Sequence, residues 1–163
     1  MKILVTGSSG LIGSEAVEHY DHCLAILGDT PPPSVPIILN VHFPHNVPKN
    51  ARCLQFGHAL YRAIKNFKGF GRVALMASGG LTHFVIDEEL DKTILNAMAK
   101  GDEAALEKIP ENVFKVGTAE TKNWYPVIAA MHAAGLKYHQ VDYVPCYRSE
   151  AGTGNAMAFV YWD

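Results

Sequence analysis

The stretch Arg72–His83, RVALMASGGLTH, decides the fold that we expect for this chain. Its apolar run, Val73–Ala77, is typical of a buried strand, and the glycine pair after it allows a sharp turn because glycine has no Cβ. Open α/β sheets bind ligands in the loops after the carboxyl ends of such strands. His83 lies in such a loop, and an imidazole exchanges protons near neutral pH. The stretch predicts a strand followed by a candidate acid–base residue, with a purely structural histidine as the alternative.

The composition is that of a globular domain. The chain has 163 residues, of which 48% are hydrophobic and 18% charged, and a formal net charge of -2. This length suffices for one domain with a substantial core. No apolar run approaches the roughly 18 residues of a membrane helix, and a slightly acidic chain without a basic stripe argues against nucleic acid. Three widely spaced cysteines favour a reducing compartment. We therefore expect a cytoplasmic protein that binds neither membranes nor nucleic acid.

Strand and helix patterns alternate along the chain. Strands are expected at residues 2–6, 35–41, 73–77, 138–145 and 156–162, and helices at 14–20, 53–67 and 87–100. Asp102 is a candidate N-cap for a shorter helix that ends before Pro110. Another helix runs to Gly135 and begins either at Thr118 or after Asn123; with the later start, Pro126 falls in the tolerant first turn. This alternation predicts an α/β sandwich around one mostly parallel or mixed sheet.

The N-terminal stretch Met1–Ser14, MKILVTGSSGLIGS, combines a strand, three glycines and a helix start that can receive a pyrophosphate. Residues 1–21 resemble the start of an NAD-dependent epimerase of the extended short-chain dehydrogenases, with Asp29 as a candidate ribose-binding acid. Tyr61 and Lys65 match that family's Tyr-x-x-x-Lys pair, but they come too early in the chain and lie on a predicted helix whose apolar face explains their spacing. The alternative is an ordinary first strand and turn that does not bind NAD.

Five blocks follow in the rest of the chain: VPIILN with FP at 35–44, ARC with GHAL at 51–60, ASGGLTH at 77–83, AETKNW at 119–124 and YRSEAGTGNA at 147–156. In this order and at these separations they resemble the class III extradiol ring-cleavage dioxygenases of the LigB-type superfamily. The resemblance covers about residues 31–163. It implies a three-layer LigB-like sandwich of which this chain holds the C-terminal part, and therefore an N-terminally truncated domain.

The resemblance implies O2-dependent cleavage of a catecholic aromatic acid such as protocatechuate or gallate. Two histidines and one carboxylate hold Fe(II) in these enzymes, and a further histidine transfers the proton of the catechol hydroxyl. By the resemblance, His83 is this acid–base residue and Glu120 is the carboxylate ligand. Two structural alternatives stay open: His83 caps the segment at Asp87, or Glu120 is a first-turn helix residue favoured by the helix dipole.

The chain departs from the family at the two iron-binding histidines, which the family places before the equivalent of Pro31. The first strand here ends in GSSG at residues 7–10, without a histidine. Tyr20-Asp21-His22 echoes the family's second ligand turn, so His22 is the candidate ligand. His42 and His45 fall where the family places none, and a surface loop explains them better. We therefore expect an inactive or incomplete dioxygenase.

Three functional hypotheses stand side by side. The favoured one is a ring-cleaving dioxygenase or a remnant of one. The second is a nucleotide-binding module that uses Gly7, Gly10 and Gly13 and takes NAD. The third is a subunit that completes its metal site with another chain. For the first and third hypotheses we expect a homo-oligomer or a partner subunit. Arg148 and Lys122 are each either a partner for a substrate carboxylate or a solvated surface charge.

Overall fold

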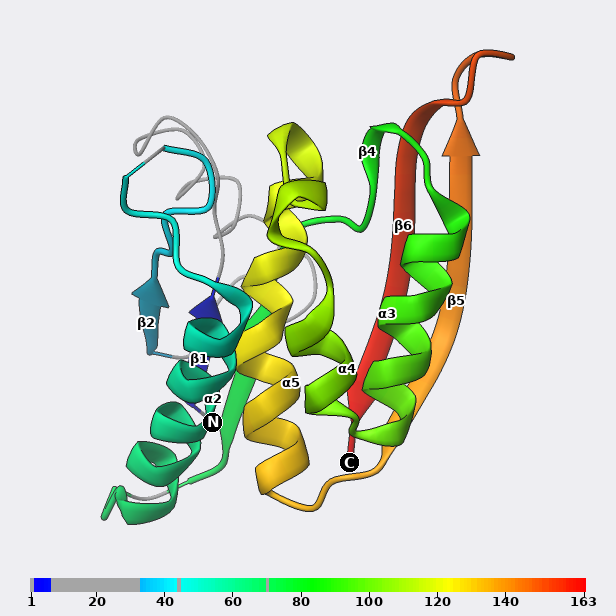
Figure 1. Cartoon of the computed structure of the whole chain (residues 1–163). Helices are drawn as coiled ribbons and strands as arrows, with labels where there is room; N and C mark the ends of the chain where they lie inside the picture. The colour runs from blue at the N-terminus through cyan, green and yellow to red at the C-terminus, as the bar shows by residue number, and fades with distance from the viewer. Residues whose placement is uncertain (1, 7–32, 44, 70) are drawn as a thin grey trace.

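The computed structural model describes residues 2–6, 33–43, 45–69 and 71–163 (Figure 1). The glycine turn at residues 7–13, the helix expected at 14–20, and His22 lie outside this part of the chain. Strands and helices alternate through the described residues, which confirms the α/β class. No helix in the described residues has both the length and the apolar character needed to cross a membrane.

A parallel sheet forms from the first strands of the chain. Its central strand is β1 (Lys2–Thr6), which pairs with β2 (Ser34–Ile37) on one side and β3 (Val73–Ala77) on the other. Strands β1 and β3 have the predicted bounds. Strand β2 ends earlier than expected because Asn40 closes a local turn: its Oδ1 accepts a hydrogen bond from the Phe43 amide at 2.9 Å.

The remaining strands form a second, antiparallel sheet in the order β4-β6-β5: β4 (His83–Val85), β6 (Thr153–Trp162) and β5 (Tyr138–Tyr147). The described strands therefore make two three-stranded ladders, where the sequence predicted one sheet. A cavity of about 580 Å³, lined by residues of β3, β6 and helix α5, lies between the two sheets. Strands on opposite sides of this cavity are too far apart to share hydrogen bonds.

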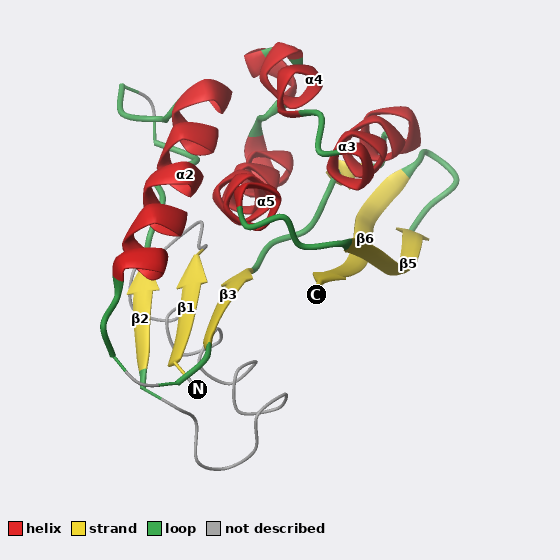
Figure 2. Ribbon diagram, turned by 90° about the horizontal axis from the view of Figure 1, so that it is seen from below, coloured by secondary structure: helices red, strands yellow, loops and turns green. Residues whose placement is uncertain are grey.

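Two helices, α2 (Asn50–Asn66) and α5 (Trp124–Ala133), pack closely against each other. A Cβ added at Gly57 of α2 would lie 2.3 Å from the Pro126 carbonyl oxygen, so only glycine permits this approach. Helix α5 starts after Asn123, the later of the two predicted starts. Residues Val116–Asn123 before it form the 3-10 helix η2. Figure 2 shows α5 between the parallel strands and the β5–β6 hairpin.

Helices α3 (Glu88–Lys100) and α4 (Glu103–Lys108) begin and end where their capping residues predict. The Asp102 side chain accepts a hydrogen bond from the Ala105 amide at 2.9 Å, and Gly101 ends α3 with a φ of 64°. A second 3-10 helix, η1 (Glu111–Val113), follows α4. The core lies between the helices and the antiparallel sheet, and its fully buried large apolar side chains are Leu81, Ile94, Leu106, Tyr125 and Ile128.

Candidate functional site

The glycine pair after β3 brings two predicted site residues to one place. A Cβ built on Gly79 would lie 3.1 Å from the Glu120 Cβ and 3.5 Å from its Oε2. A Cβ built on the next residue, Gly80, would lie 2.0 Å from the His83 Nε2. Larger residues would collide with these side chains, and Gly79 also has a φ of 118°, which favours glycine. His83 and Glu120 therefore contact neighbouring residues of the same turn.

His83 is held more firmly than a loop residue. It starts strand β4 and pairs with Asn155 of β6, although the sequence placed it in a loop. Its backbone amide donates to the Thr118 Oγ1 at 3.1 Å. On the opposite side of the ring, a Cβ at Gly117 would lie 2.6 Å from the His83 Nδ1. The imidazole therefore lies between two glycines, and neither position tolerates a larger residue without moving it.

Two buried polar atoms next to the glycine pair lack a partner. Within the described residues, neither the His83 Nε2 nor the Asn155 Oδ1 has a hydrogen bond. Both are close to Gly80, at 2.0 Å and 2.9 Å from the position of its missing Cβ. Buried polar groups in native proteins are nearly always hydrogen-bonded, so this point is suited to a polar group of a ligand. Sequence reasoning did not single out Asn155, and only its pairing with His83 across the sheet reveals it.

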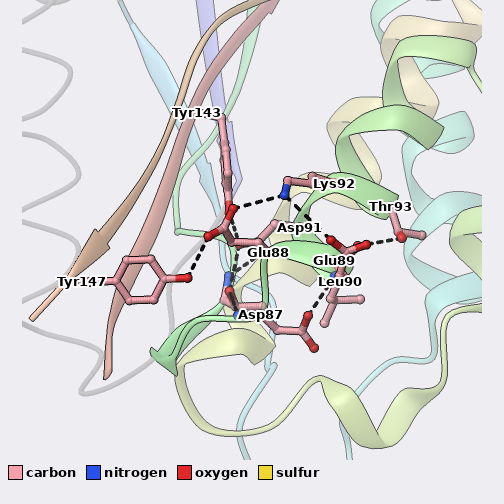
Figure 3. A network of polar contacts seen from close by, with 10 residues as sticks. Asp87, Glu88, Glu89, Leu90, Asp91, Lys92, Thr93, Tyr143 and Tyr147 are labelled. Atoms are coloured by element: carbon pink, nitrogen blue, oxygen red, sulfur yellow. Dashed lines mark hydrogen bonds and ion pairs between the residues drawn. The ribbon is translucent and has the colours of Figure 1, made fainter. Parts of the chain in front are cut away.

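A buried carboxylate fixes the residue before His83. Asp91 of α3 is fully buried and accepts hydrogen bonds from the Thr82 amide at 3.0 Å and the Thr82 Oγ1 at 2.9 Å. The Tyr143 hydroxyl of β5 donates to the same carboxylate at 2.8 Å (Figure 3). Burial raises the pKa of the Asp91 carboxyl, and the three hydrogen bonds oppose this shift. Helix α3 and strand β5 thus hold Thr82, and with it the start of β4. His83 does not cap this helix, because the N-cap is Asp87.

Side chains at the end of η2 and the start of α5 donate hydrogen bonds to the carbonyl groups of the glycine pair. The Trp124 Nε1 donates to the Gly79 carbonyl oxygen at 3.1 Å. The Thr121 Oγ1 donates to the Gly80 carbonyl oxygen at 3.3 Å. Thr121 lies in η2 beside Glu120, which is therefore not in the first turn of an α-helix, and Trp124 starts α5 directly after η2. These two hydrogen bonds attach the glycine turn to the segment that carries Glu120.

Two residues next to the imidazole have strained backbones. Phe84 follows His83 and has a φ of 67°, and Val116 precedes Gly117 with a φ of 51°. Positive φ is rare for bulky residues and rarest for β-branched ones. Each such conformation costs on the order of 1–3 kcal/mol, and they gather at functional sites. Both side chains are large, apolar and exposed.

Two residues considered as partners for a substrate carboxylate have different surroundings. Lys122 is 2% exposed, and its Nζ donates to the Glu111 Oε2 at 2.5 Å and to the Pro48 carbonyl oxygen at 3.0 Å. The prediction of a solvated Lys122 is therefore wrong, and its ammonium is already paired inside the protein. Arg148 is exposed at the turn between β5 and β6.

The described residues do not complete an iron site. Among them, no three His, Cys, Asp or Glu side chains come together in a way that could hold a metal ion. His45 is exposed and His42 half-buried in the segment after β2, as a surface loop predicts. Glu120 alone does not supply the two histidines and one carboxylate that non-haem Fe(II) takes. The donor set in this part of the chain therefore does not fit Fe(II).

Comparison with known proteins identifies the family. Residues 24–161 match the family model described as the catalytic LigB subunit of aromatic ring-opening dioxygenase. No curated protein matches the chain. The epimerase-like interpretation of residues 1–21 stays a prediction. Since the match spans most of the 163 residues, the chain belongs to the LigB family of aromatic ring-opening dioxygenase catalytic subunits.

Proposed function

We propose that the chain carries the proton-transfer part of an extradiol ring-cleavage site for a catecholic aromatic acid such as protocatechuate or gallate. The observation that carries this proposal is the buried His83 Nε2, which has no hydrogen-bond partner within the described residues and lies beside the turn that also contacts Glu120. The family supplies the reaction class, aromatic ring opening. The site supplies a positioned imidazole whose buried Nε2 has no hydrogen-bond partner in the part of the chain that the structure describes.

The residues themselves support three steps. The His83 Nε2 takes the proton of a ring hydroxyl, which a neutral imidazole does near neutral pH. The two flanking glycines and strand β4 keep bulk water away from this nitrogen, since its atom is buried. The Asp91–Thr82 bonds keep the start of β4 in place during the transfer. This positioning matters because misplacing a catalytic group by about 1 Å costs roughly 100-fold in rate.

The iron centre requires more ligands than the described residues offer. The resemblance to the class III extradiol dioxygenases implies non-haem iron, with O2 as the co-substrate. In this proposal Glu120 is the carboxylate ligand, and the missing histidines come from His22 or from another chain. A homo-oligomer or a partner subunit in the cytoplasm belongs to the same proposal. The three-layer sandwich around one sheet stays a prediction for the domain as a whole.

Anaerobic titration of the purified chain with Fe(II), followed by protocatechuate, gallate or unsubstituted catechol and then O2, tests the proposal. Ring-opened product is measured by its absorbance. We expect weak turnover, since at most two of the three iron ligands are present, and a preference for the two acids over catechol. Robust turnover would show that His22 or His42 acts as a ligand. Ring opening that is equal in wild type and in a heat-denatured sample with the same iron would contradict the proposal.

A further inference from the structure

Backbone hydrogen bonds between the segment before β4 and strand β6 place Asn155 opposite His83. The Ala156 amide donates to the Thr82 carbonyl oxygen at 2.9 Å, and the Leu81 amide donates to the Ala156 carbonyl oxygen at 3.1 Å. His83 and Asn155 are consequently register partners in the β4–β6 pair. This backbone pairing keeps the Asn155 main chain beside His83.

The unpaired atoms of the two residues are close enough to share one ligand atom. One oxygen about 2.8 Å from each of two polar atoms bridges a separation of up to about 5.6 Å. The His83 Nε2 and the Asn155 Oδ1 lie no farther apart than the sum of their distances to the Gly80 position, 2.0 Å and 2.9 Å. That separation is within the range of a single bridging oxygen.

The chemistry of the pair selects the kind of oxygen. The Asn155 Oδ1 only accepts hydrogen bonds, whereas the imidazole nitrogen donates or accepts according to its protonation. A hydroxyl satisfies both, because it donates its hydrogen to the Oδ1 and accepts from the Nε2–H, or turns its hydrogen to a neutral Nε2. An ether or carboxylate oxygen has no hydrogen and leaves the Oδ1 unpaired, which is costly for a buried acceptor.

We propose that Asn155 is a substrate-binding residue, which together with His83 holds one ring hydroxyl of the aromatic substrate. This inference rests on the proposed function and adds to it a selectivity for free hydroxyls over methyl ethers. Asn155 orients the hydroxyl by accepting its hydrogen. When this hydrogen turns to the His83 Nε2, the imidazole takes the proton, so that Asn155 places the substrate in the position from which its proton leaves.

The hydroxyl reaches this point when the chain beside the imidazole relaxes. The Nε2 and the Oδ1 are both covered, and the residues next to the imidazole include Phe84 and Val116, whose φ values are 67° and 51°. A move of either residue to negative φ releases strain and shifts the backbone that adjoins His83. The release of backbone strain thus favours binding of the hydroxyl.

Side-chain NMR of the full-length, ¹⁵N-labelled chain without iron tests the inference. The imidazole signals of His83 are assigned by their loss in His83→Gln and followed during titration with protocatechuate or with 3,4-dimethoxybenzoate. We expect the Nε2 signal to shift with protocatechuate alone. Asn155→Ala weakens this binding by about tenfold, the effect of one hydrogen bond to a buried group. Asn155→Asp, which keeps an acceptor, binds more tightly than Asn155→Ala. Asn112→Ala, a substitution of an exposed asparagine in η1, is the matched control and binds as wild type does.

The outcomes separate this inference from the function on which it rests. If protocatechuate shifts the His83 signal equally in wild type and in a folded Asn155→Ala chain, the role of Asn155 is refuted and the proposed function stands. If 3,4-dimethoxybenzoate shifts the signal as strongly as protocatechuate does, the selectivity for hydroxyls is refuted. If protocatechuate leaves the His83 signal unchanged in wild type, the proposed function fails, and the role of Asn155 fails with it.

Discussion

Replacing Gly80 with alanine is expected to push the His83 imidazole out of its position. The new Cβ would lie 2.0 Å from the His83 Nε2 and 2.9 Å from the Asn155 Oδ1. To reach an ordinary contact of 3.4 Å, the ring has to move by roughly 1.4 Å. Overpacking of this kind costs about 1–3 kcal/mol of folding free energy. For a chain of this length, each kcal/mol lowers the Tm by roughly 2–4 °C.

The effect on function should exceed the effect on stability. A displacement of about 1 Å in a catalytic group lowers rates roughly 100-fold, so Gly80→Ala should abolish the response of His83 to protocatechuate while the chain stays folded. Thermal unfolding measures the stability, and side-chain NMR measures the position of the imidazole.

Gly152→Ala is the matched control for this substitution. Gly152 has a φ of 77° and no atom within 4 Å of its added Cβ, so alanine there costs only backbone strain, about 1–2 kcal/mol. The two variants should therefore lose similar amounts of folding free energy, but only Gly80→Ala should change the NMR signal of the His83 imidazole. An unmoved His83 signal in Gly80→Ala, with a Tm equal to that of wild type, would refute the steric argument.

Three further predictions concern other parts of the chain. Burial raises the pKa of the Asp91 carboxyl, so the folded chain binds this proton more tightly than the unfolded chain does. The contribution of Asp91 to the free energy of unfolding therefore falls as the pH rises through its folded pKa. Denaturant unfolding across pH should show this fall in wild type and not in Asp91→Asn. Glu111→Ala leaves the buried Lys122 ammonium without its carboxylate and should cost about 3–5 kcal/mol in urea unfolding, and a loss below 1 kcal/mol would contradict the pairing. Calorimetry with NAD and NADP should show no productive binding by the N-terminal glycine turn, since a dinucleotide needs further strands beneath it; micromolar binding that Gly10→Val removes would revive the epimerase-like alternative.

Local signals predicted the elements that depend on local chemistry. Strands β1 and β3 follow from short apolar runs, and the ends of α3 and α4 follow from Asp87, Gly101 and Asp102. Each capping signal is a side chain or a φ angle within a few residues of the helix end. Such features do not depend on how the chain folds as a whole.

The features that the sequence did not predict arise from pairing over long distances. The short strand β4 exists because Leu81 and Thr82 exchange hydrogen bonds with Ala156. The same pairing places Asn155 at His83, which no local pattern indicates. Lys122 was expected to be exposed or to bind substrate because lysines are seldom buried. Its burial depends on Glu111, which adjoins it only in the folded chain.

The most direct measurement compares ring-opened product from wild type, His83→Ala and Glu120→Gln at the same total Fe(II), with bound iron measured in parallel. We predict that His83→Ala keeps the bound iron of wild type but forms no product, since the role of His83 is proton transfer. Glu120→Gln should lose iron and product together, because it removes a charged ligand. Product formation by His83→Ala at the wild-type rate would contradict the account.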